Sequence, residues 1–414
     1  MASRETSRDY AHPHRPLPLR FYNKLGRLRA PRPFDVDAMI AKARRDTGLV
    51  DFEIPEFRPV LEQLCASLER EASLSATGRL LTGINIRTSL EANLRARAWS
   101  QREPLIAETP LLRPIMVCGL ARSGTTLLQR LLGALPGARP LLAWEALEPV
   151  PALDWRPPAE PLADPRVSRA RTAEKFLGWI SPDLFAVHPM DATAPEEDVM
   201  ILDKVFMSGV SESTFRVPSF GAWLEQQDQT PAYRWLERCL RHLQLQRSAD
   251  ASFWVLKSPH HLEWLDTVFE VFPDITVIQT HRAPRVTVPS FCSLVAHGWG
   301  VMSDTVDPRE VGRYWLRKID RMLSRALETR ERRGGAGFID VDYSELTGDP
   351  LGVMERLCGQ LGLPWSERTR SELEGWLATN RQHKHGVHRY AAEDFGLTEG
   401  EIDERFAAYS RKFL

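Results

Sequence analysis

Apolar and polar residues alternate along the chain in two rhythms, and the rhythm changes near residue 111. From residue 34 to about residue 102, apolar positions recur every three or four residues, as in DVDAMIAKARRDTG and FRPVLEQLCASLEREA. This spacing is typical of amphipathic helices, and Gly48 follows the first pattern where a helix terminator is expected. We therefore predict a helical extension over residues 34–110.

Beyond residue 111, short apolar runs alternate with helical patterns. The apolar runs PIMVCG, FWVLK, ITVIQTH and GFIDVDY predict buried strands, and the apolar stripe of LLQRLLGAL predicts a helix directly after the first of them. A further helix is expected from about Leu262 to Phe272. Strands that alternate with helices indicate a mostly parallel sheet with helices on both faces. The predicted fold is therefore α/β, with three α/β/α layers, over residues 111–414.

Two segments do not follow this alternation. Residues 1–33 are basic and broken by prolines, and they lack the apolar centre of a secretory signal. We expect them to form a flexible arm, with a membrane-surface or targeting segment as the alternative. Residues from about 164 to 250 predict a helical insertion rich in aromatic residues, which suit either a substrate cleft or ordinary packing.

Composition excludes several classes of protein. The formal net charge of −1 provides no overall attraction for nucleic acid, and no apolar run is long enough to cross a membrane. The five cysteines are isolated and lack the spacing of a disulfide framework or a zinc site. We therefore expect a cytoplasmic protein without a metal, a nucleic-acid partner or an integral membrane segment. The sequence does not define the oligomeric state.

The run GLARSGTT at residues 119–126 has the glycine spacing of a phosphate-binding loop. Glycines allow a sharp turn that directs successive N–H groups at phosphate oxygens, and the following helix adds its own N-terminal N–H groups. A nucleotide-hydrolysing loop has lysine where this chain has Thr125, and the cation here is Arg122. The strand ITVIQT is not followed by an acidic residue that could hold magnesium. Both features argue against a kinase or NTPase.

The sequence GLARSGTTLL resembles the 5′-phosphosulfate loop of the sulfotransferase superfamily, in its bacterial and tyrosylprotein-type branch. WVLKSPHHL, FPDITVIQTHR and VDYSEL also occur in the order seen in long bacterial sulfotransferases. The resemblance implies transfer of a sulfuryl group from 3′-phosphoadenosine 5′-phosphosulfate (PAPS) to a hydroxyl or amine, without a metal. It assigns the phosphosulfate contacts to Arg122, Ser123, Gly124, Thr125 and Thr126. A non-catalytic binding protein with the same fold is the remaining alternative.

A second anchor for the donor is expected at the 3′-phosphate. Arg282 follows the strand ITVIQTH, at the edge where open α/β sheets bind ligands, and Ser290 lies eight residues later. In sulfotransferases an arginine and a serine at this spacing hold the 3′-phosphate. This chain has Ala283 where the family often has aspartate. The basic segment from Lys384 to Tyr390 resembles one that closes over the nucleotide, or is a solvated tail.

Three residues are candidates for the chemistry. Lys257 ends the strand FWVLK, where the family has a lysine that reaches the bridging oxygen or the sulfuryl group. Glu145 lies in the region of the glutamate base of the tyrosylprotein branch, with Glu148 as a nearby alternative. His260 corresponds to the histidine base of cytosolic sulfotransferases, and an imidazole titrates near neutrality. We favour Glu145 over His260, and either could instead be structural.

The acceptor is expected to bind on the helical insertion at residues 164–250. Its segment VHPMDATAPEEDV carries His188, Glu196 and Glu197, which we interpret as part of an acceptor-side lid, the alternative being a solvated loop. The aromatic residues and the lack of a strongly basic face indicate a small molecule rather than a polyanionic polysaccharide.

Overall fold

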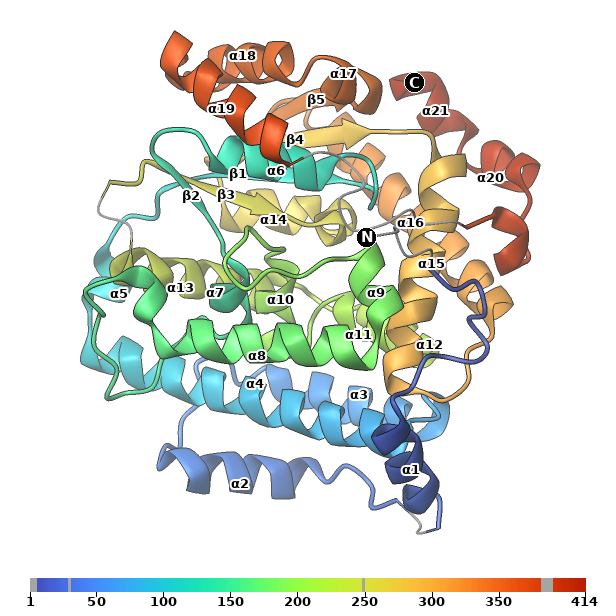
Figure 1. The fold of residues 1–414 in the computed structure, drawn as a ribbon. Coiled ribbons are helices and arrows are strands. Elements are labelled where there is room, and N and C mark those ends of the chain that lie inside the picture. Colours follow the sequence, from blue (N-terminus) through green and yellow to red (C-terminus); the bar gives the residue numbers. More distant parts are fainter. Residues whose placement is uncertain (1–5, 29–30, 248–249, 381–389) are drawn as a thin grey trace.

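A five-stranded parallel sheet forms the centre of the protein (Figure 1). The computed structural model describes residues 6–28, 31–247, 250–380 and 390–414. The strand order is β2-β3-β1-β4-β5, and every neighbouring pair is parallel. The strands are β1 (Arg113–Gly119), β2 (Ala138–Pro140), β3 (Phe253–Lys257), β4 (Thr276–His281) and β5 (Phe338–Asp342). Four of them coincide with the four apolar runs, which confirms the predicted mostly parallel α/β fold.

Successive residues of the central strands face two different apolar cores. On β1, Met116 and Cys118 belong to the larger core, whereas Ile115 and Val117 belong to the smaller one. All four side chains are fully buried, as expected for a parallel sheet that is covered on both faces. The sheet therefore lies between two helical layers, as the sequence predicted.

The smaller core is covered by the helix that follows the glycine loop and by helices near the C-terminus (Figure 1). These helices are α6 (Thr125–Gly133), α17 (Tyr343–Gly348), α18 (Pro350–Leu361) and α19 (Glu367–Thr379). In α6, Leu128, Leu131 and Leu132 are fully buried against the sheet, which is the apolar stripe that the sequence predicts.

The larger core combines the other face of the sheet with helices from both ends of the chain. The helices before the sheet are α1 (Leu17–Gly26), α2 (Val36–Thr47), α3 (Phe57–Glu71), α4 (Ala76–Arg102) and α5 (Leu105–Glu108). Asp35 caps the start of α2, and Gly48 ends it in a left-handed conformation. Leu64 of α3 and Leu90 of α4 are buried in the same core as Met116 of β1. The segment 34–110 therefore shares its packing with the sheet.

Helices of the middle and later parts of the chain complete this layer. Between β2 and β3 lie α7 (Ala143–Leu147), η1 (Pro161–Ala163), α8 (Pro165–Ile180), α9 (Pro182–Val187), α10 (Val199–Leu202), η2 (Asp203–Val205), α11 (Val210–Thr214), α12 (Pro218–Leu224) and α13 (Thr230–Gln246). After β3 come η3 (Pro259–Glu263), α14 (Leu265–Val271), α15 (Pro284–Met302), α16 (Pro308–Arg332), η4 (Ala392–Phe395), α20 (Glu399–Arg405) and α21 (Ala407–Phe413). Across the described parts of the chain, no helix combines the length and apolarity needed to span a membrane.

Candidate functional site

The glycine loop joins the end of β1 to the start of α6 at the carboxyl edge of the sheet. Gly124 has a φ of 89°, a left-handed conformation that favours glycine. A Cβ at Gly119 would lie 2.2 Å from the Thr280 Oγ1 atom of β4, so this position excludes any side chain. Arg122 is exposed and also has a positive φ, of 73°, which is uncommon for a residue other than glycine. The loop is therefore held in a strained, sharply turned shape.

Ser123 stabilises this loop from the inside. Its buried hydroxyl lies 2.6 Å from the Leu120 carbonyl oxygen and 2.6 Å from Thr280 Oγ1. The expected contact of the Ser123 hydroxyl with a phosphosulfate is thus not favoured, because both of these partners belong to the protein. Thr125 is also buried, whereas Thr126 is exposed at the start of α6.

Arg282 lies beside the loop, as expected from its place after β4. Its Nη1 atom donates to the Arg122 carbonyl oxygen at 2.7 Å, and its guanidinium carbon lies 3.8 Å from the centre of the Tyr343 ring. Tyr343, at the start of α17, was not among the predicted residues. The stacking holds the Arg282 guanidinium at the carboxyl edge of the sheet, where a ligand anion would bind.

Ser290 fits the expected anion site for a different reason. It lies on α15, the helix that follows Arg282, and is fully buried. Among the described residues, its hydroxyl has no hydrogen-bond partner. A buried polar group without a partner is unfavourable unless a ligand or water completes it. The unpartnered hydroxyl of Ser290 is therefore suited to bind a polar group of a ligand. Residues 381–389, most of the basic Lys384–Tyr390 candidate, lie outside the described residues.

Lys257, a buried residue at the end of β3, forms an ion pair with the partly buried Glu197. Its Nζ atom donates to Glu197 Oε1 at 2.6 Å, and the Ser258 hydroxyl donates to Glu197 Oε2 at 3.1 Å. Burial raises the pKa of Glu197, but the positive charge of Lys257, with a smaller effect of His188, outweighs it and holds the pKa below its usual value. Glu197, which sequence reasoning assigned to a lid, thus belongs to the site.

His260 lies in η3, three residues after Lys257. Its Nδ1 atom accepts from the Gly209 N–H at 3.3 Å, and its buried Nε2 atom has no partner among the described residues. Burial lowers the pKa of His260 well below its usual value, so the ring is neutral near pH 7. Because Nδ1 is an acceptor, the hydrogen of the neutral ring resides on Nε2. His260 is therefore arranged to donate a hydrogen bond.

A cavity of about 300 Å³ connects these groups to the helical insertion. Ala121 of the glycine loop lines it, together with Glu197, Ser258 and His260. The rest of the wall is largely apolar and includes Leu177, Leu184, Met200, Phe291, Leu294 and Met322. An apolar cavity with a few polar groups at one place is the usual form of a small-molecule site.

Glu145 is not among the residues that line this cavity, which argues against our preference for it as the general base. It is in α7 with an exposed fraction of 1%, and its carboxylate accepts from Arg139 at 2.7 and 2.9 Å and from the Leu142 N–H at 3.0 Å. The Nη2 atom of Arg247 lies 3.3 Å from Glu145 Oε1. Burial raises the pKa of Glu145, but Arg139 lowers it more. The carboxylate is therefore occupied by protein groups, which favours the structural role that the sequence left open.

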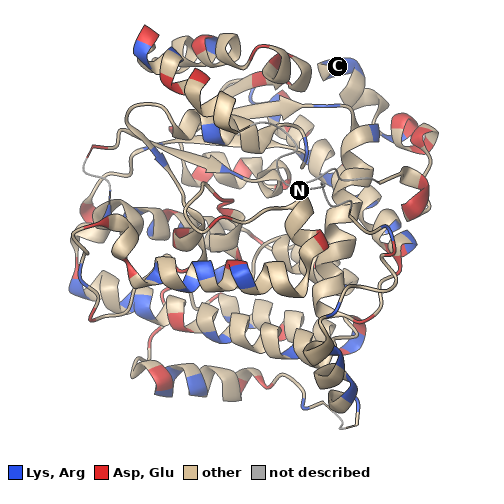
Figure 2. Ribbon diagram, viewed as in Figure 1, with Lys and Arg blue, Asp and Glu red and all other residues tan. Residues whose placement is uncertain are grey.

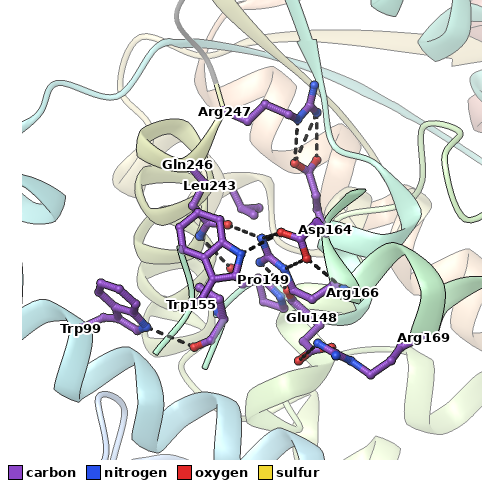
Figure 3. A network of polar contacts seen from close by, with 12 residues as sticks. Trp99, Glu148, Pro149, Trp155, Asp164, Arg166, Arg169, Leu243, Gln246 and Arg247 are labelled. Atoms are coloured by element: carbon purple, nitrogen blue, oxygen red, sulfur yellow. Dashed lines mark hydrogen bonds and ion pairs between the residues drawn. The ribbon is translucent and has the colours of Figure 1, made fainter. Parts of the chain in front are cut away.

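Glu148, the alternative to Glu145, is also engaged in protein contacts. It forms an ion pair with Arg169 of α8 at 2.9 Å (Figure 3). Next to it, Arg166 and Asp164 form a buried pair at 2.8 Å, and the Trp155 indole donates to Asp164. This network fixes the start of α8, the helix that carries Leu177 into the cavity wall. Both glutamates thus support the site rather than enter it.

Comparisons with known proteins identify the family of this chain. The sequence profile of the Sulfotransferase family matches residues 114–367. The chain is 31% identical to the solved structure of sulfotransferase STF1 from Mycobacterium tuberculosis H37Rv, with a TM-score of 0.77 and coverage of 91% of this chain and 99% of that one. Sulfotransferase STF9 from Mycobacterium avium gives 27% identity, a TM-score of 0.81 and coverage of 93% and 98%.

A curated relative, the omega-hydroxy-beta-dihydromenaquinone-9 sulfotransferase Stf3 of Mycobacterium bovis, is 27% identical over 319 residues, which are 73% of this chain and 77% of the relative. The same values hold for the protein of that name from Mycobacterium tuberculosis. Because the family match covers more than half of the chain, this protein belongs to the Sulfotransferase family. It is a sulfotransferase enzyme, as its glycine loop indicated.

Proposed function

We propose that this enzyme transfers a sulfuryl group from PAPS to the hydroxyl group of a small, largely apolar molecule. The observation that supports this most directly is the single cavity that Ala121 of the glycine loop, Ser258 and His260 share with an apolar wall. The name of the curated relative, a hydroxylated menaquinone sulfotransferase, is consistent with such an acceptor. The buried cysteines, which form no disulfide in the structure, are consistent with a reducing cytoplasm.

The donor, when bound, supplies an activated sulfuryl group and a nucleotide leaving group. On the protein side, Arg122 and the N–H groups at the start of α6 are suited to bind the 5′-phosphosulfate. Arg282 and the unpartnered hydroxyl of Ser290 are suited to the 3′-phosphate, with the arginine as a charged hydrogen-bond donor. The glycine loop thus holds one end of the nucleotide and β4–α15 the other.

The remaining polar groups are suited to handle a proton. In this proposal, Glu197 accepts the hydroxyl proton of the acceptor on a carboxylate oxygen, because it lines the cavity and is ionised. Lys257 holds that carboxylate in place and supplies positive charge where negative charge develops. His260 donates from Nε2 to an oxygen in the cavity. The apolar wall excludes water from this end.

The test is a sulfation assay with radiolabelled PAPS and a series of apolar alcohols. In Glu197→Gln the carboxylate is replaced by an amide, and we expect turnover to fall by about 10² or more, because general-base catalysis is lost. Glu196→Gln is the matched control, because Glu196 also lines the cavity but makes no contact with Lys257. Near-normal turnover of Glu197→Gln would reject Glu197 as the base, and failure to label any alcohol would reject the acceptor class.

A further inference from the structure

The exposed side of helix α1 is apolar, which reverses the usual orientation of a surface helix. Leu17, Phe21 and Leu25 follow one another at intervals of four residues and therefore share one face. They are exposed, with Leu17 at 77%, and Leu28 in the following turn is exposed at 79%. A soluble surface helix normally directs its polar face at water. This row of side chains is referred to below as the α1 stripe.

The opposite face of α1 is held on the body by polar anchors. Asn23 is buried, and its side-chain oxygen accepts from the Thr77 N–H at 2.9 Å while its amide donates to Asp304 at 2.9 Å. Arg27 pairs with the same Asp304 at 2.8 Å. The exposure of the α1 stripe is therefore a consequence of how the helix is fixed, because turning the helix inward would break these contacts.

The segment before α1 is packed as well, although we expected a flexible arm. Tyr10 is buried, and its hydroxyl lies 2.7 Å from Ser293 Oγ of α15. The Ser7 N–H donates to Asp183 of α9, the helix whose Leu184 lines the acceptor cavity. The arm thus runs from α9 across α15 to α1. A surface that engages the α1 stripe would be connected to the acceptor side of the enzyme.

Helix α1 carries lysine and arginine but no aspartate or glutamate (Figure 2). Its helical spacing places Arg20 and Lys24 along one side of the α1 stripe. Arg20 and Lys24 are exposed, and neither has an ion-pair partner among the residues that the structure describes. No acidic residue occurs in the sequence from Tyr10 to Phe34. An apolar row of leucine and phenylalanine next to unpaired cations is complementary to a layer of anionic lipid headgroups above acyl chains.

We propose that the α1 stripe and its basic border form a docking surface for an anionic lipid membrane, on which the enzyme lies without spanning it. The charge of the border favours lipid over an apolar protein partner. A neutral apolar partner would have no need of Arg20 and Lys24. The proposal concerns attachment alone, so it does not depend on the acceptor or the donor.

Cosedimentation of the full chain with vesicles tests this proposal. We expect binding to phosphatidylcholine vesicles that contain phosphatidylglycerol, and much weaker binding to phosphatidylcholine alone. The variant L17S/F21S/L25S removes the stripe and should weaken binding more than about tenfold. R20E/K24E keeps the stripe, and its binding to the anionic vesicles should weaken about fivefold or more for each cation. L105S/L162S, at exposed apolar residues of α5 and η1, is the matched control and should bind normally.

Two readouts keep the outcomes distinct. Thermal unfolding verifies that each variant is folded, and R20E/K24E alters surface charges only, so it remains informative if the serine variant is unstable. Light scattering of the free protein reports its oligomeric state. Absence of binding to anionic vesicles, or binding that neither variant weakens, would overturn the proposal. So would a dimer that L17S/F21S/L25S dissociates, because the stripe would then be a contact between two copies.

Discussion

The donor and acceptor ends of the site are built in different ways. The donor end is built from short motifs, since Gly119 to Thr126 form one turn and Arg282 directly follows the strand β4. The acceptor end collects side chains from α8, α9 and the segment around Glu197 and, about 100 residues later, from α15 and α16. Recognition of the nucleotide thus depends on short motifs. Recognition of the acceptor depends on the tertiary packing of the helical layer.

Two glutamates, Glu145 and Glu197, show the same difference at the level of single residues. Glu145 is enclosed by Arg139 and Arg247, with no access to the cavity. Glu197 is held by Lys257 and Ser258 on one side and lines the cavity on the other. Both have a pKa below the usual value, so charge alone does not distinguish them. What distinguishes them is that Glu197 lines the cavity and Glu145 does not.

The largest effect is expected from Glu145→Gln, which separates the two glutamates by stability. Removing one partner of a buried ion pair costs about 3–5 kcal/mol. We expect a loss of that size in urea unfolding, with turnover per folded molecule unchanged. Glu148→Gln, at the partly exposed pair with Arg169, should lose less than about 1 kcal/mol. Loss of turnover in a stable Glu145→Gln enzyme would restore Glu145 as the base.

The stability difference between wild type and Glu145→Gln should depend on pH. The pKa of Glu145 in the folded protein lies below its usual value of 4.5, so on acidification the unfolded chain takes up the proton first. The stability due to the charged carboxylate is therefore complete at neutral pH and declines as the pH falls through the folded pKa. Unfolding measured at neutral pH and at about pH 4 should show the gap between wild type and Glu145→Gln narrowing in acid.

We expect Lys257→Ala to have a smaller free-energy effect than Glu145→Gln. Unlike that variant, it acts directly on catalysis. Loss of a preorganised charge at the reacting centre lowers turnover by about 10²–10³, and Glu197 is left without its cation. Lys412→Ala, a surface lysine on α21, is the control. Steady-state kinetics at saturating donor provide the measurement. If the two variants have equal turnover, Lys257 takes no part in the chemistry.

The smallest effect is expected at the acceptor wall. Leu294→Ala enlarges the cavity and removes apolar contact, so the acceptor KM should rise about tenfold with little change in nucleotide binding. Leu245→Ala, at an exposed leucine of α13, should leave both unchanged. An equal loss of nucleotide affinity in Leu294→Ala would mean that the two ends of the site are not separable.

The sequence predicted the fold better than it predicted the site. The strand runs were continuous and apolar, so β1, β3, β4 and β5 could be located, and the sulfotransferase assignment followed from the glycine loop. The three residues of β2 are too few to give a pattern. The inverted exposure of α1 was also beyond the sequence, because it depends on the anchoring of Asn23 to Thr77 and Asp304.

Within the site, the sequence indicated the residues of local motifs, but it could not indicate the contacts between residues far apart in the chain. Arg122, Lys257 and Arg282 were proposed from their places at or after the ends of strands and from the resemblance to sulfotransferases. The pairing of Lys257 with Glu197 joins segments 60 residues apart, and the stacking of Arg282 on Tyr343 joins β4 to α17. Two patterns, WEALE at residues 144–148 and PEEDV at residues 195–199, contain several glutamates, and only the packing reveals which of them reaches the cavity.

The central claim is that the glycine loop and Arg282 bind a nucleotide with a 3′-phosphate. Calorimetric titration with adenosine 3′,5′-bisphosphate, and with ATP plus magnesium for contrast, tests it most directly. Arg285→Ala is the matched control, since Arg285 lies three residues on and pairs with Asp403. We predict tight binding of the bisphosphate, weakened about 10- to 100-fold by Arg282→Ala and unchanged by Arg285→Ala, with little affinity for ATP. Preference for ATP, or equal affinity of the two variants, would contradict it.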